Sequence, residues 1–279
     1  MTNNLGYYKE SGTIDKIGIF KMIFIGLIGS LLGAVAYSFF IYYIPLIYFN
    51  VFATVIFGYV ISYSISYGAK IGKIRNSKLI IFLTLITSIV SIYFHWIIWL
   101  GTYLDWNYIY WFPTDIYNLM RDVAEGGMTI SGRYGSGGFT IPGNLYPIIW
   151  VAEALIILYI SFTKCKPEEA FCEVCENWVK DKNELKFKIP ENLNFENFKN
   201  ILEKGEIKEI SSLEKLENLV EGDHLLLTFS SCDTCGGTSY LSLDNMKYKV
   251  TKKEANYNKK PIIKKLLVTK ENYNYLKSL

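Results

Sequence analysis

Four of the five cysteines in this 279-residue chain form two Cys-x-x-Cys pairs, Cys172 with Cys175 and Cys232 with Cys235. Two thiols at this spacing lie on one tight turn and point at one ion, so each pair predicts half of a tetrahedral metal site. We expect the four thiolates to hold one structural zinc ion. Iron takes the same ligands and is the alternative. A metal with four thiolate ligands has no open position for a substrate, which argues against metal catalysis.

Other roles for the cysteines are redox catalysis and disulfide bonding. The strand and helix arrangement of thioredoxin-like enzymes is missing around both pairs, and disulfides would require an oxidising compartment. Cys165 is the odd thiol, for which we expect a spare buried or interfacial position. A swapped ligand and an acylation site are its alternatives.

The second pair is followed by Gly236 and lies between apolar runs at 224–229 and 240–243, which predict antiparallel strands. Glycine after the second thiol is typical because the turn there needs a positive φ. Over about residues 171–250 the cysteine pairs resemble the zinc-ribbon and rubredoxin-like group, which implies two knuckles on hairpins that share one metal. The chain departs from that group because 56 residues, 176–231, separate the pairs. We expect this insert to contain a helix over 195–204 and a short strand over 207–210.

Four long apolar segments precede the cysteine pairs, at 18–43, 46–67, 79–103 and 146–163. A helix needs about 20 such residues to cross a bilayer, so the sequence predicts four membrane spans. Lys and Arg gather in the loop 68–78 and before the first span, whereas the loop 104–145 has no Lys. This bias predicts a multi-pass protein of the bacterial inner membrane with both termini in the cytoplasm.

The start of the chain allows a different interpretation. Lys16 and Lys21, the apolar run 22–33 and the small residues at 34–36 imitate a secretory signal with its cleavage site. The apolar run continues beyond Ala36, which favours a membrane span.

Three polar residues of the spans, Asn50, His95 and Glu153, lie at similar depths by residue count. A carboxyl group in hydrocarbon needs a partner, so we expect an intramembrane polar cluster of these residues. One hypothesis is a hydrogen-bonded layer that fixes helix register. The other is a proton or ion relay through Glu153 and His95.

The outer loop, 104–145, begins with aromatic residues that favour the membrane interface. Thr114 or Asp115 is expected to cap a short helix that ends at Gly126. The glycine-rich stretch 126–143 has no Gly-Lys-Ser/Thr motif, which argues against a nucleotide site.

The predicted fold is an all-α four-helix membrane domain, 18–163, between a cytosolic segment, 1–17, and a small cytosolic α+β domain, 164–279, with the two zinc knuckles. No Ser-His-acid set or carboxylate cluster indicates an enzyme, and the net charge of +3 is too small to indicate nucleic acid. The favoured function is a membrane anchor, in contact with lipid, for a zinc-binding module. That module is expected to bind a protein partner or to have a regulatory role. A small transporter or channel subunit is the alternative, and the sequence does not decide whether the chain forms oligomers. A membrane enzyme that acts on lipid through His95 and Glu153 is a third hypothesis.

Overall fold

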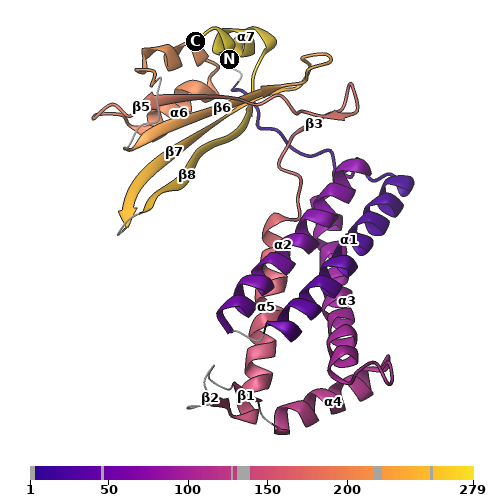
Figure 1. Cartoon of the computed structure of the whole chain (residues 1–279). Coiled ribbons are helices and arrows are strands. Elements are labelled where there is room, and N and C mark those ends of the chain that lie inside the picture. Colours follow the sequence, from indigo (N-terminus) through magenta and orange to yellow (C-terminus); the bar gives the residue numbers. More distant parts are fainter. Residues whose placement is uncertain (1–3, 45–46, 127, 131–138, 217–221, 252–253) are drawn as a thin grey trace. The chain divides into compact units, whose positions relative to one another are not determined.

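The computed structural model describes residues 4–44, 47–126, 128–130, 139–216, 222–251 and 254–279 (Figure 1). It contains two compact units. One is helical and comprises Ser11–Pro167. The other combines the first ten residues of the chain with Glu168–Leu279 around an antiparallel sheet, and we call it the sheet unit.

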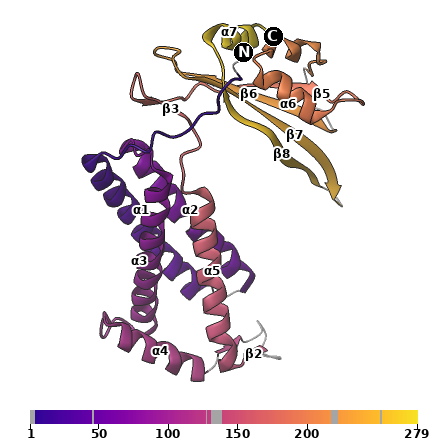
Figure 2. The ribbon, with the colours of Figure 1, turned by 180° about the vertical axis from the view of Figure 1, so that it is seen from behind.

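The helical unit contains the four predicted apolar segments as long helices, α1 (Lys16–Tyr43), α2 (Ile47–Ile71), α3 (Ser77–Tyr103) and α5 (Tyr146–Lys164) (Figure 2). All four are long and apolar enough to cross a membrane. Side-chain caps start two of them: Asp15 accepts a hydrogen bond from the Gly18 amide at 2.9 Å, and Asn76 accepts one from the Leu79 amide at 3.0 Å.

Small residues let α1 pack closely against α2. Every fourth residue of α1 is buried, and most of these are small; the series comprises Gly18, Met22, Gly26, Ser30, Ala34 and Ser38. A Cβ atom on Gly18 would lie 2.1 Å from the carbonyl oxygen of Gly72. Only glycine permits this approach of the two backbones, which agrees with the packing role expected of small residues in apolar helices.

The segment between α3 and α5 contains the predicted short helix, α4 (Pro113–Gly126). Two short strands follow it, β1 (Met128–Ile130) and β2 (Phe139–Ile141), which pair antiparallel. A 3-10 turn, η1 (Gly143–Leu145), then leads into α5. Much of the glycine-rich stretch expected at 126–143 lies outside the described residues.

The sheet unit is built on four antiparallel strands in sequence order: β5 (Asn183–Lys188), β6 (His224–Ser231), β7 (Ser239–Thr251) and β8 (Glu254–Leu267). Two helices, α6 (Phe195–Glu203) and α7 (Lys270–Ser278), pack on its core with the 3-10 turn η2 (Ile207–Ser212). A separate hairpin precedes the sheet. Its two strands, β3 (Phe171–Cys172) and β4 (Asn177–Trp178), are two residues long each.

The predicted helix after Asn194 is confirmed: the Asn194 side chain caps α6, and Gly205 follows its end with a φ of +90°. The short strand predicted at 207–210 is wrong, because this segment forms η2. Ile207 and Ile210 are both buried and three residues apart. That spacing places them on one face of a 3-10 turn, whereas the two faces of a strand would separate them.

Residues 4–10 form an additional edge of the sheet beside β8. Tyr7 pairs with Leu266, the Tyr8 amide donates to the Lys265 carbonyl at 2.9 Å, and the Leu267 amide donates to the Gly6 carbonyl at 2.8 Å. Leu5 and Tyr7 also pack against the core of the sheet unit. This segment, residues 4–10, is therefore an integral part of a domain whose other residues begin at Glu168.

Tyr8 connects this segment to the β3–β4 hairpin, because its hydroxyl accepts a hydrogen bond from the Phe171 amide at 2.9 Å. Tyr8→Phe removes this acceptor and leaves the amide of a buried residue without it. We expect the free energy of unfolding of the sheet unit to fall by about 1 kcal/mol, and the amides of residues 168–178 to exchange faster with deuterium. Tyr275→Phe, which removes the same atom from a half-buried tyrosine in α7, is the control. Equal exchange in wild type and Tyr8→Phe would contradict this role.

Candidate metal centre and the polar residues of the helices

The first Cys-x-x-Cys pair lies on the turn of the β3–β4 hairpin. Cys172 ends β3, and Cys175 follows within the turn. Glu176 closes this turn with a φ of +51°, a left-handed conformation that non-glycine residues adopt only at some cost. The ring of Phe171 meets that of Trp178 edge to face across the hairpin, with 5.1 Å between the ring centroids, and fixes the base of the turn.

The second pair lies between the ends of β6 and β7. The Cys232 amide donates to the Thr238 carbonyl at 2.9 Å, and the Gly236 amide donates to the Cys232 carbonyl at 2.8 Å. Gly236 has a φ of +64°, which confirms the prediction that the residue after the second thiol needs a positive φ. Both pairs therefore lie on hairpin turns, as the resemblance to zinc ribbons implies.

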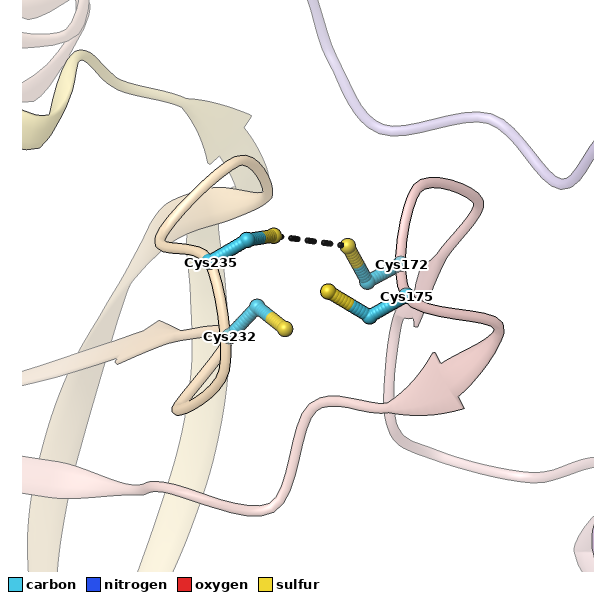
Figure 3. Close-up of side chains that lie close together, drawn as sticks. All are labelled: Cys172, Cys175, Cys232 and Cys235. Carbon is cyan, nitrogen blue, oxygen red and sulfur yellow. Dashed lines mark hydrogen bonds between the residues drawn. The ribbon is translucent and has the colours of Figure 1, made fainter.

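The two turns face each other, and the four sulfur atoms converge on one point (Figure 3). All four Sγ atoms lie within 4.8 Å of one another, and those of Cys172 and Cys235 are 3.5 Å apart. The separation of these two sulfurs is far longer than a disulfide bond of about 2.05 Å. Tetrahedral zinc with bonds of about 2.3 Å places its sulfur ligands about 3.8 Å apart. The cluster therefore has the donor set and the spacing to hold a metal ion.

The surroundings of the cluster favour a closed site. Cys172 and Cys232 are buried, and Cys175 and Cys235 are half-buried. Apolar and aromatic residues pack around them: Tyr8, Ala170, Val179, Tyr240 and Leu267. Such a shell excludes water from the inner ligands and leaves the outer two near the surface.

The thiols of the cluster differ in acidity. Burial disfavours the Cys172 thiolate, but hydrogen bonds, led by that from Thr238, lower the pKa of this thiol to about 6. The hydrogen bond to Cys235, followed by burial and neighbouring thiolates, raises the pKa of Cys175 to about 12. A metal ion must displace the proton of Cys175, so metal affinity is expected to rise with pH.

Cys165 is not one of the four clustered thiols. It is fully buried in the helical unit with Met22, Ile65 and Ile80, and its thiol is 3.4 Å from the Phe162 carbonyl oxygen. This position agrees with a spare buried thiol and gives it no part in the metal centre.

The polar residues predicted for the helices have different surroundings. His95 is buried, and its Nδ1 forms a 2.8 Å hydrogen bond with the hydroxyl of Ser38 in α1. Asn50 accepts a hydrogen bond from Thr54 through its backbone carbonyl, while its buried Oδ1 has no hydrogen-bond partner within the described structure. Glu153 is half-buried. No hydrogen bond recorded among the described residues joins any two of Asn50, His95 and Glu153.

Two residues of α1 that the sequence did not single out complete these contacts. The Tyr37 hydroxyl lies 3.0 Å from that of Thr54, and its ring lies 4.7 Å from the His95 ring, centroid to centroid. Ser38 continues the four-residue series of Ser30 and Ala34, which was the available signal for it. Tyr37 offered no such signal because tyrosines are abundant throughout the chain.

No protein-family model, curated protein or solved structure matches this chain. Its function must therefore be argued from the chemistry of these sites.

Metal binding depends on Cys172 if the four thiols act together. We expect the full chain, purified in detergent, to retain about one metal ion, and Cys172→Ser to lose it because the oxygen is a poor substitute for a buried thiolate. Cys165→Ser is the matched control and should retain the ion, since Cys165 is outside the cluster. Elemental mass spectrometry measures both. A folded wild-type chain without metal, or full occupancy in Cys172→Ser, would contradict the site.

Proposed function

We propose that this chain is an integral protein of the bacterial inner membrane whose four helices anchor a cytosolic zinc-binding module for interaction or regulation. The observation that carries the proposal is the convergence of four cysteine sulfurs within 4.8 Å in a domain attached to four long apolar helices. Zinc is favoured over iron because it needs only the closed thiolate tetrahedron and no redox role.

The composition of the sheet unit supports an even number of membrane crossings. Residues 4–10 precede α1 and Glu168 follows α5, yet both belong to one folded domain. Both ends of the helical unit must then lie on one side of the membrane, which four spans satisfy. Cleavage after Ala36 would remove residues 4–10 from the sheet, so the secretory-signal alternative is disfavoured.

Regulation is supported by the path of the chain around the metal centre. Tyr8 packs against the apolar cluster that includes Cys172 and Cys232, and its hydroxyl accepts a hydrogen bond from the Phe171 amide. Its segment leads into α1 within ten residues. The first knuckle leads back to α5 within ten residues as well. Gain or loss of the metal therefore acts on the domain to which both ends of the helical unit are attached.

The surface of the metal centre supports a protein partner. Val174, at the tip of the first knuckle, is 79% exposed. Among the described residues of the sheet unit, it is the most exposed large apolar side chain. A partner that covers the knuckle tip would bury this side chain and sense the metal-dependent shape of the turn.

The proposed topology is tested with single cysteines at exposed positions. Ser211→Cys lies in η2 of the sheet unit, and Thr114→Cys lies in α4 between the third and fourth spans. We expect an impermeant maleimide to label Thr114→Cys in intact spheroplasts and Ser211→Cys only after lysis, because the two sites lie on opposite sides. Labelling of Ser211→Cys in intact spheroplasts would contradict the cytosolic location proposed for the metal centre.

The second candidate is a small transporter or channel subunit with Asn50, His95 and Glu153 in its path. The observation that favours it is a set of buried polar atoms without hydrogen-bond partners within the described structure: Asn50 Oδ1 and the hydroxyls of Ser62, Ser88 and Ser91. Polar groups in this condition are suited to line a hydrated path.

Ion flux in proteoliposomes tests this candidate. If the path exists, Glu153→Gln should abolish proton-coupled flux and His95→Ala should reduce it at least tenfold, because the relay loses a titratable group. Ser30→Ala is the control, since that hydroxyl bonds only to carbonyls of its own helix. Absence of flux in the wild type, or flux that both variants leave unchanged, would eliminate the transport function.

A further inference from the structure

An open apolar cavity of about 760 Å³ lies between α3, α4, η1 and α5 in the helical unit. Its volume falls in the range of about 300–1,000 Å³ that holds small organic ligands. The walls are mainly apolar and aromatic, and include Trp96, Met120, Pro147, Trp150 and Ala154. Arg121, Glu125 and Asn144 are the charged and amide side chains of the lining.

The polar and apolar parts of this lining are separated along the helices. Arg121 and Glu125 belong to α4, and Asn144 belongs to the turn that begins the fourth apolar segment. Trp96 lies seven residues before the end of α3, and Ala154 lies eight residues after the start of α5. At about 1.5 Å per residue, the cavity reaches about 10–12 Å from its polar end into the apolar part of the helices.

These dimensions correspond to one leaflet of a bilayer. The hydrocarbon core is about 30 Å thick, so one leaflet contributes about 15 Å. A cavity with a charged mouth at the level of α4 and apolar walls over most of that depth has the polarity profile of a lipid. In a membrane such a cavity fills with hydrocarbon, because water gains no hydrogen bonds from its walls.

The charges at the mouth indicate the headgroup. Arg121 Nε lies 3.5 Å from Glu125 Oε1, and an Arg121 terminal nitrogen lies 3.8 Å from Asp122 Oδ1. All three side chains are more than half exposed, so these ion pairs contribute little and can be exchanged. Arg binds phosphate with two parallel hydrogen bonds, and a carboxylate at the same rim binds an ammonium group. Arg121 and Glu125, the two charged residues of the cavity lining, therefore complement a headgroup that carries both a negative and a positive charge.

We propose that this cavity binds a zwitterionic phospholipid of the leaflet on the side of α4, with one acyl chain between α3 and α5. The headgroup phosphate contacts Arg121, and its ammonium contacts Glu125. The inference rests on the proposed membrane insertion of the four helices and is independent of the metal centre. It assigns a lipid-binding role to the segment between α3 and α5, in which the short helix α4 contacts the headgroup.

The test counts phospholipids retained by the full chain after purification in mild detergent, by native mass spectrometry. Ala154→Phe fills the cavity and should reduce retained phosphatidylethanolamine at least fivefold. Ala152→Phe makes the same change on the exposed side of α5 and should retain the wild-type amount. Arg121→Gln should reduce retention about fivefold, since a charged hydrogen-bonding partner of the phosphate is lost. Glu125→Gln should shift the retained lipid toward phosphatidylglycerol.

Three results would overturn the inference: equal retention by Ala154→Phe and Ala152→Phe, retention of anionic lipid alone by the wild type, or a dimer that only Ala154→Phe dissociates. The last would identify a second copy of the chain as the occupant. An unchanged elution profile shows that Ala154→Phe is folded, and Arg121→Gln tests the headgroup contact without filling the cavity. Extraction of the wild-type chain from membranes by alkali would instead refute the proposed membrane insertion.

Discussion

In the sheet unit, four thiol groups from two separate turns lie within 4.8 Å of one another, and this crowding limits the charge that the turns can carry. Their thiolates repel one another, and this repulsion is one cause of the raised pKa of Cys175, whereas hydrogen bonds led by that from Thr238 lower the pKa of Cys172. A divalent ion bound between the four thiolates offsets this repulsion, because its positive charge takes the place of the displaced protons. The two hairpin turns are separated by 56 residues, and such an ion would join them directly.

The helical unit is organised by a different rule. Its four long helices have apolar residues on nearly every side, so burial of apolar surface cannot decide which faces meet. Glycines such as Gly18 and Gly72 decide it instead, because their backbones approach where any Cβ would collide. The hydrogen bond between Ser38 and His95 then fixes α1 against α3 at a single register.

The parts of the fold that follow from local patterns were predictable. Long apolar runs specified the four long helices, the Cys-x-x-Cys spacing specified the two turns, and Asn194 with Gly205 bounded α6. The rest depends on partners distant in sequence. Tyr7 and Tyr8 enter the sheet only because β8 offers a free edge, and β8 itself is rich in lysine and has Pro261 within it. The 3-10 turn η2 shows the same limit. Two isoleucines three residues apart are compatible with a short strand until the structure shows that both are buried in the same core.

The antiparallel bridge between Tyr7 and Leu266 has a consequence for synthesis of the protein. These residues are 259 positions apart in the chain (266 − 7), with all four apolar helices between them. At about 5–20 residues per second, Tyr7 leaves the ribosome roughly 13–50 s before Leu266 does. During that interval the four apolar helices leave the ribosome while the sheet lacks an edge. The sheet unit therefore cannot complete its fold until translation has passed β8, so its assembly reports that the whole helical unit has been made.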